Sequence, residues 1–169
     1  MTLLLGFNMG FSQTQYEIDS LLTALTGTEN SKGIRNTEQA EKIISYHEKA
    51  LPILAEFFID STETNIKSDC HSRHLTKGEL AIIMADHIDR MPYAILTGVR
   101  NCILEFCPNN SNLIEHYLPS INDDGFSNFK QKYLSWLSEE WIEQVKGKKR
   151  RERKKIINEW KESDNKQRL

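Results

Sequence analysis

The sequence is poor in the two residues that most often break regular structure, with four prolines and eight glycines in 169 residues. This scarcity argues against long disordered or collagen-like stretches. No apolar run reaches the roughly 18–20 residues that a helix needs to cross a bilayer. The chain also lacks a zinc-protease H-E-x-x-H, a G-x-S-x-G nucleophile turn, a phosphate loop and a dinucleotide fingerprint. Its 38% hydrophobic and 27% charged residues are typical of one globular domain with a core.

Cysteine is scarce and odd in number, with only Cys70, Cys102 and Cys107. No pair has the C-x-x-C spacing of redox or c-type haem motifs. In an oxidising compartment we expect a disulfide from Cys70 to Cys102 or Cys107, with one thiol left over. In the cytosol all three would be buried thiols. Composition alone leaves both interpretations open.

Positive charge is missing from the start of the chain, where Lys32 is the first basic residue. Residues 1–12 are mostly apolar and end in Gly10-Phe11-Ser12, which resembles the small-x-small pattern before a signal-peptidase cut. A signal peptide would also need a positive n-region. We therefore interpret residues 1–12 as a signal-peptide remnant or as an apolar arm packed on the domain. The first favours a periplasmic or secreted protein, and the second a cytoplasmic one.

Helical periodicity dominates the remainder, most clearly from Leu75 to Cys107. Thr76 and Glu79 have the spacing of a capping box, and Leu75 and Leu80 that of a hydrophobic staple. Pro92 ends this helix or begins a second one, expected to run to about Phe106 with Gly98 inside it. The apolar stripe of the first helix consists of Leu80, Ile83, Met84, His87, Ile88 and Met91.

Other start signals predict further helices. Thr14 and Glu17 form a capping box before an apolar stripe. Asn36 is expected to cap a long helix that continues to Phe58. Pro52 lies inside that stripe and predicts a kink or break near Ala50.

The last third of the chain predicts two more helices. Asn112 and Glu115 cap a short one, which Pro119 is expected to end. A long final helix begins at Phe126, and its packing face consists of Phe126, Phe129, Tyr133, Trp136, Leu137 and Trp141.

Residues 60–74 form a polar connection without strand-length alternation or a hairpin signal. The fold class predicted is therefore all-α, a bundle of about five or six helices. We divide the chain into the apolar segment 1–12, a helical domain 13–145 and a basic helical tail 146–169.

The charge is unevenly distributed between body and tail. Residues 146–169 contain eleven Lys and Arg against four acidic residues, a net charge of +7, whereas residues 1–145 carry −9. Such a run can bind nucleic-acid phosphates or an anionic membrane, and it can also be a solvated helix end or fold over the acidic body. The candidate contacts are Lys148, Lys149, Arg150, Arg151, Arg153, Lys154 and Lys155.

Two clusters could carry chemistry. Cys70, His71 and His74 are zinc-type ligands on one loop, with His87 or Glu79 as a fourth. However, structural zinc sites usually show a second cluster, so a polar loop is the simpler interpretation.

Glu79, Asp86 and His87 share one predicted helix and could position a general base. Capping, a solvated helix face and a core histidine explain the same three residues. We therefore predict a non-catalytic interaction protein of the bacterial envelope, or a secreted one, with an unidentified protein partner. The alternatives are a metal-dependent enzyme that uses the loop and helix histidines, with zinc as its cofactor, and a nucleic-acid binder that uses the tail.

Overall fold

The computed structural model describes residues 8–25, 28–99, 107 and 112–143, and every structural statement below refers to this part of the chain. Its helices are α1 (Asn8–Thr23), α2 (Glu38–Ser45), α3 (Ala50–Phe57), α4 (Lys77–Ile88), α5 (Tyr93–Thr97), α6 (Leu118–Asp124) and α7 (Phe126–Glu143). Three short 3₁₀ helices are η1 (Ser31–Asn36), η2 (His47–Lys49) and η3 (Leu113–Tyr117). The predicted fold class is confirmed, since about six helices have seven or more residues. An antiparallel hairpin of β1 (Glu63–Lys67) and β2 (His74–Thr76) is added to it.

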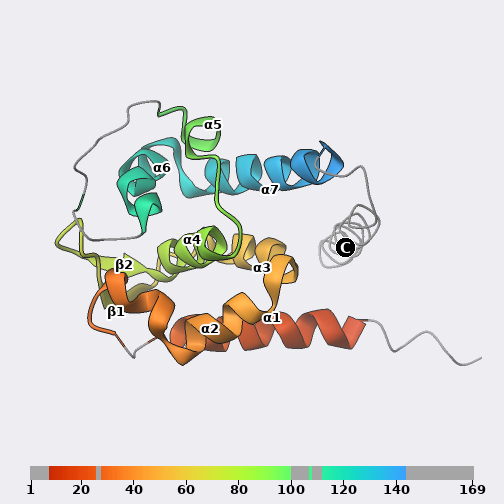
Figure 1. Ribbon diagram of the computed structural model, residues 1–169, viewed down its shortest axis with the longest axis horizontal. Coiled ribbons are helices and arrows are strands. Elements are labelled where there is room, and N and C mark those ends of the chain that lie inside the picture. Colours follow the sequence, from red (N-terminus) through yellow and green to blue (C-terminus); the bar gives the residue numbers. More distant parts are fainter. Residues whose placement is uncertain (1–7, 26–27, 100–106, 108–111, 144–169) are drawn as a thin grey trace, which may run out of the picture.

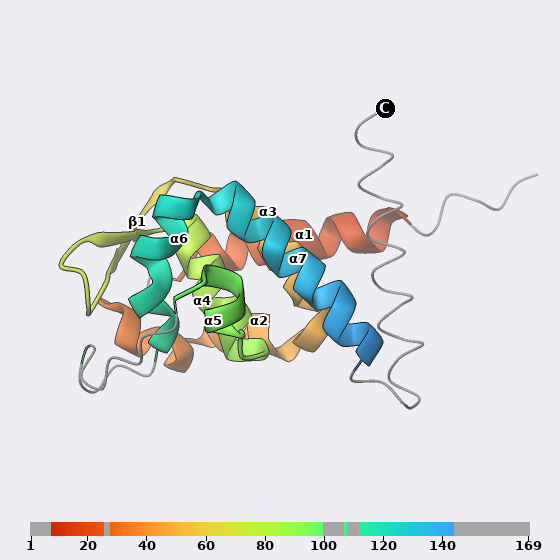
Figure 2. The same cartoon turned by 90° about the horizontal axis from the view of Figure 1, so that it is seen from above.

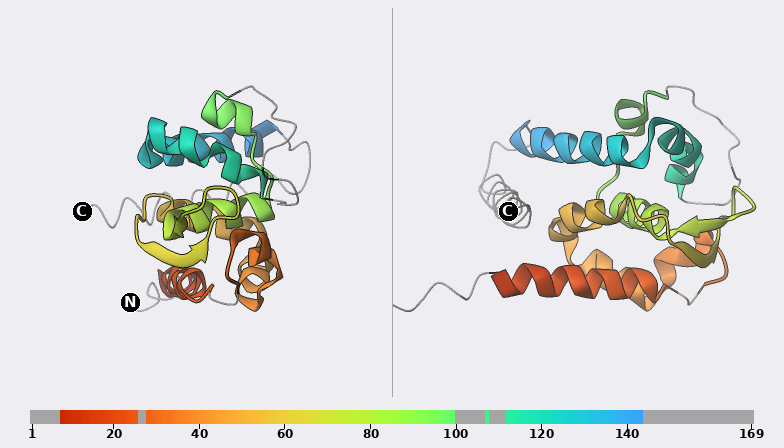
Figure 3. Two further views of the ribbon diagram at one scale, coloured as in Figure 1. Left: turned by 90° about the vertical axis from the view of Figure 1, so that its left-hand side faces the viewer. Right: turned by 180° about the vertical axis from the view of Figure 1, so that it is seen from behind.

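The helices lie in three layers (Figure 1). The first contains α1 and α2, the middle one α3 and α4, and the third α5, α6 and α7, with the hairpin at one end. From above, α7 runs obliquely over α3, which it contacts (Figure 2). The side and reverse views show the same order of layers (Figure 3). The α3–α4 pair is therefore covered on both sides.

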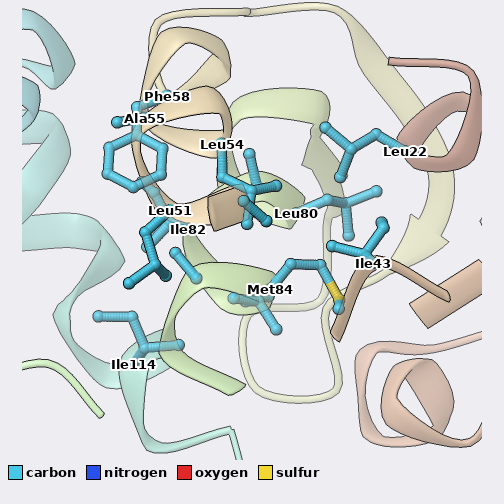
Figure 4. Close-up of a cluster of buried hydrophobic side chains, with 14 of the residues drawn as sticks. Leu22, Ile43, Leu51, Leu54, Ala55, Phe58, Leu80, Ile82, Met84 and Ile114 are labelled. Carbon is cyan, nitrogen blue, oxygen red and sulfur yellow. The ribbon is translucent and has the colours of Figure 1, made fainter. Parts of the chain in front are cut away.

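Helix α4 is the centre of the core. Its residues 78–85 are all buried, although the sequence predicted one apolar stripe. Burial extends around the helix because α3, α2, α1 and η3 all contact it. Each fully buried Leu, Ile or Met side chain contributes roughly 1.5–3 kcal/mol of transfer free energy. Figure 4 shows the cluster that results, which includes Leu22, Ile43, Leu51, Leu54, Leu80, Ile82, Met84 and Ile114.

Gly78 allows the start of α4 to approach the end of α3. A Cβ at this position would lie 2.5 Å from the Phe58 carbonyl oxygen and 2.9 Å from that of Asp60. These neighbours are backbone atoms and cannot rotate away. The Gly78 N–H instead donates to the Asp60 carbonyl at 2.8 Å. Because glycine has no side chain, the connection 58–62 can lie directly against the start of α4, where this hydrogen bond holds it.

Two helices were predicted correctly, but each begins at a different residue from the one expected. α1 begins at Asn8, so Thr14 lies inside it. The cap of α2 is Thr37, whose side chain accepts from the Ala40 N–H, in place of Asn36. The predicted break between α2 and α3 is present, but it falls at Tyr46 and at His47, whose φ is +53°. Pro52 lies in the first turn of α3, where a missing N–H costs nothing.

The helix predicted to run to Phe106 ends instead at Thr97. Gly98 follows it with φ +73°, a left-handed C-terminal cap, so the glycine terminates the helix in place of easing helix packing. Pro119 was expected to end a helix, but it occupies the first turn of α6 and favours its start. The predicted short helix is instead the 3₁₀ helix η3.

The final helix is confirmed as α7, and Phe129, Tyr133 and Leu137 form its buried face. Residue 141 belongs to α7, but its tryptophan side chain is outside the part that the structure describes. Phe58 joins α7 to the α3 end, with ring centroids 5.8 Å from Phe129 and 5.1 Å from Tyr133. Among the described helices, none is both long enough and apolar enough to span a bilayer.

Candidate functional site

The hairpin and its connecting loop, residues 63–76, form what we call the hairpin wall. Glu63 pairs with Thr76 and Lys67 with His74, and only two short strands are formed. Ile66 and Leu75 are its buried apolar residues. Thr64 Oγ1 donates to the Leu75 carbonyl at 2.8 Å. With so little apolar surface, the wall depends on polar and covalent contacts.

Ser68 organises the loop between the strands. Its N–H donates to the Arg73 carbonyl at 2.7 Å, which closes the loop. Its Oγ accepts from the N–H groups of Cys70 and His71 at 3.2 and 3.0 Å. The same Oγ donates to Glu115 Oε2 at 2.6 Å. The buried Ser68 hydroxyl thereby shapes the loop and attaches it to η3.

A disulfide makes a second attachment. Cys70 is bonded to Cys107, 37 positions away, with their Cα atoms 5.4 Å apart. This is one of the two pairings predicted from the sequence, and it uses Cys70 as expected. Cys102 lies outside the described residues. A disulfide is consistent with an oxidising, extracytoplasmic setting.

Glu115 lies at the centre of a buried polar network. Its side chain has no solvent exposure and accepts from Ser68 Oγ and, at 3.3 Å, from Asn112 Nδ2. Asn112 Nδ2 also donates to the Ser31 carbonyl at 2.7 Å. His71 Nε2 lies 2.6 Å from the Glu115 carbonyl oxygen, so this nitrogen carries the proton. The network joins η1, the hairpin wall and η3.

His87 reaches the same network from α4. Its Nε2 donates to Asn112 Oδ1 at 2.7 Å, because the amide nitrogen of Asn112 is already a donor to Ser31. The buried Nδ1 has no hydrogen-bond partner among the described residues. The pKa of His87 is lowered, mainly by burial and to a smaller extent by the charge of Arg35. The hydrogen bond with Asn112 and the charge of Asp86 raise this pKa but do not outweigh burial. His87 is a neutral, hydrogen-bonded core histidine.

Arg73 and Glu79 form a forked ion pair at the base of the wall. The two guanidinium nitrogens lie 2.8 and 2.5 Å from the two carboxylate oxygens. Glu79 also accepts from the Thr76 N–H at 2.8 Å, and Thr76 Oγ1 accepts from the Glu79 N–H, so the predicted capping box is confirmed. The hydrogen bond to Glu79 is the largest cause that raises the pKa of Arg73. Glu79 thus anchors both α4 and the wall.

A pocket of about 660 Å³ opens between the hairpin wall and helices α6 and α7. Four carboxylates face one guanidinium and two imidazoles, alongside aromatic and aliphatic side chains. Its lining consists of Phe58, Ile59, Asp60, Ser61, Glu63, His71, Arg73, His74, Thr76, Glu79, Pro119, Asn122, Asp123 and Phe126.

The charged lining favours a cation. Arg73 is neutralised by Glu79, whereas Asp60, Glu63 and Asp123 remain as acidic groups. His74 Nδ1 lies within hydrogen-bond distance of Glu63 Oε1, at 2.9 Å. Partial burial raises the pKa of Asp60, but hydrogen bonds from Thr62 and the Lys77 charge outweigh it and leave that pKa lowered. Asp60 is therefore ionised at neutral pH, and the acidic side of the pocket keeps its charge.

The three weak catalytic candidates do not share the pocket. Glu79 lines it, but Asp86 and His87 do not. Asp86 accepts from the Met91 N–H at 2.9 Å and from the Tyr93 hydroxyl at 2.9 and 3.0 Å. Burial is the main cause that raises the pKa of Asp86, and burial together with the Asp86 charge raises that of Tyr93. Asp86 holds the connection between α4 and α5.

The zinc candidates are only partly brought together. His71 and His74 both line the pocket, but Cys70 is in the disulfide and His87 lies elsewhere. No three His, Cys, Asp or Glu side chains of the described part are arranged to hold a metal. The basic candidates from Lys148 to Lys155 lie outside the described residues.

Sequence reasoning missed Arg73, Asp60, Glu63 and Asp123 as pocket residues. They come from segments without helical periodicity or from exposed helix positions, so no local signal marks them. Glu115 was expected only as a helix-cap partner of Asn112. Comparison with protein-family models, with curated proteins and with solved structures finds no match to this chain.

Proposed function

We propose that this chain is a non-catalytic binding protein that recognises a partner protein through the pocket beside the hairpin wall. The observation that carries the proposal is a cavity of about 660 Å³ whose lining combines four carboxylates with Phe58, Ile59, Pro119 and Phe126. Acidic and apolar groups side by side suit a cationic side chain on an apolar stem. Lys and Arg have this construction.

The way the wall is held supports binding over catalysis. A disulfide, a forked ion pair and the bond from Ser68 to Glu115 fix the hairpin loop, together with Arg73 and Glu79 of the pocket lining, before any ligand arrives. Such pre-organisation reduces the ordering cost of association. The imidazole Nε2 of His71 is committed to a carbonyl, so it is a poor candidate for a general base or a metal ligand.

A location outside the cytoplasm, in the periplasm or the medium, belongs to the same proposal. The Cys70–Cys107 disulfide supports it, because reducing cytosols keep thiols free. An anionic polymer is a poor fit to the pocket, since its phosphates would face Asp60, Glu63 and Asp123. Nucleic-acid binding would have to rely on residues 146–169 alone.

Site-specific photo-cross-linking in the native host tests the proposal. A photoreactive phenylalanine derivative replaces Ser61 or Asn122, which line the pocket and are exposed, and in a matched control it replaces Glu41, an exposed residue of α2. We expect a discrete adduct with another protein from both pocket positions and none from Glu41. The adduct should be lost when Asp60→Asn and Asp123→Asn are added. Equal adducts from Glu41, or none from either pocket position, would contradict the proposal.

A further inference from the structure

Opposite charges lie on two parts of this chain. Residues 146–169 carry +7 and residues 1–145 carry −9. In the described part, the pocket gathers four carboxylates in one concave surface. Four carboxylates outnumber the single guanidinium of Arg73, and a concave site in which one sign of charge predominates attracts the opposite charge. The basic segment is tethered to the body, so its effective concentration at this surface is high.

The chain outside the described residues is long enough to reach the pocket. Phe126, at the start of α7, lines the pocket, and α7 ends at Glu143. With a rise of 1.5 Å per residue, these 18 residues carry the chain roughly 27 Å away. Residues 144–169 then remain, and an extended chain spans up to about 3.3 Å per residue. About eight or nine residues past Glu143 are needed to cover this distance, so the part of the segment from about residue 152 onward can reach the pocket.

The order of residues in this segment complements the lining. The basic run from Lys146 to Lys155 is followed by Ile156, Ile157 and Trp160. The pocket places carboxylates next to apolar side chains, and one of these, Ile59, is 52% exposed. A segment with cations and then apolar groups can satisfy both kinds of surface.

We propose that residues 146–169 dock in the acidic pocket of their own chain and compete there with an external ligand. The docking rests on the pocket and the charges alone. The competition rests on the proposed function. Since Glu79 is already paired with Arg73, the carboxylates that meet the segment are Asp60, Glu63 and Asp123.

Carbodiimide cross-linking of the full chain at low salt tests the docking, because it joins an amine to a carboxylate in direct contact. We expect amide links from Lys154 or Lys155, which are far enough past Glu143 to reach the pocket, to Asp60, Glu63 or Asp123, at the mass of one chain. Glu38 and Glu41, exposed carboxylates of α2, are the internal controls. Equal yields at the controls, no pocket links, or links found only at the mass of two chains would overturn the proposal.

A matched pair of triple variants isolates the role of charge without removing reactive amines. Arg150→Gln, Arg151→Gln and Arg153→Gln together should lower the yield of pocket links about threefold or more, because three attractions are lost. The corresponding Arg→Lys triple variant adds three amines but keeps the charge, so the links from Lys154 and Lys155 alone are compared, and their yield should be unchanged. Unchanged links in the Gln variant would exclude docking by charge.

The photo-cross-link from Ser61 separates failure of the docking from failure of the proposed function. If both proposals hold, the Gln variant gives more partner adduct, because the competing segment is weakened. A partner adduct that does not change with the Gln variant contradicts the competition and leaves the proposed function intact. Amide links to the pocket without any partner adduct contradict the proposed function only.

Discussion

The α3–α4 core and the hairpin wall are adjacent but are stabilised in different ways. In the core, residues 78–85 of α4 are buried among apolar side chains of α1, α2, α3 and η3. In the wall, Ile66 and Leu75 are buried, and the loop is held by the disulfide and by Ser68 on Glu115. Apolar burial tolerates small shifts, whereas a hydrogen bond or a disulfide needs one geometry. The wall is therefore the part of the molecule where positions are most tightly specified by single residues.

Removal of the disulfide should give the largest loss of stability, and the wall should be the first part to lose its structure. Closing a loop of 37 residues in the unfolded chain corresponds to about 4 kcal/mol of stability. Cys70→Ser with Cys107→Ser should lower the free energy of unfolding by this amount, as measured by urea denaturation. In the native host it should also abolish the photo-cross-links from Ser61, although the purified variant keeps its helical circular dichroism.

The control for this variant is Cys102→Ser. It leaves the Cys70–Cys107 pair in place and should change neither readout. If the double variant kept its pocket cross-links, the wall would be held by its polar contacts without the disulfide, and the comparison would have to be revised.

The difference between the two regions also explains what the sequence could predict. The core was predictable because local periodicity specifies a buried helix, and the Thr76–Glu79 cap and α7 were found in that way. The wall was not predictable, because its contacts join distant positions. Ser68 bonds Glu115 across 47 residues, and Asn112 bonds Ser31 across 81. A short strand with one buried residue gives no alternation to detect.

The candidate site was predicted only in part, for the same reason. His71, His74 and Glu79 were recognised as chemically capable, and all three line the pocket. The role of these residues was not predicted. The ion pair between Arg73 and Glu79, for example, depends on the position of a loop that the local sequence pattern does not determine. The sequence limited the disulfide partner of Cys70 to Cys102 or Cys107, and in the structure Cys70 is bonded to Cys107.

A cavity in the core should give the second-largest effect and leave the wall intact. Leu54 of α3 has no solvent exposure and lies in the cluster of Figure 4. Leu54→Ala should lower the free energy of unfolding by about 3 kcal/mol, because a buried side chain is removed and its space is only partly refilled. Pocket cross-links from Ser61 should persist at full yield in the folded protein. Loss of those links would show that the core and the wall are one cooperative unit.

Protonation of His87 should give the smallest effect, and it tests the polar junction between the two regions. His87 belongs to α4 but donates to Asn112 of the network, and burial lowers its pKa in the folded protein. The unfolded chain therefore takes up a proton more readily than the folded one. The resulting stability is complete above the unfolded pKa near 6.5 and is lost as the pH falls below it, with a slope of less than about 1.4 kcal/mol per pH unit.

Urea denaturation of the wild type and of His87→Gln between pH 8 and pH 5 measures this effect. Glutamine can still donate to Asn112 but does not titrate, and the remaining histidines are the same in both proteins. The wild type should lose stability below about pH 6.5 relative to the variant. Parallel profiles would mean that the buried Nδ1 accepts a proton without cost, and that the junction between core and wall is open to water.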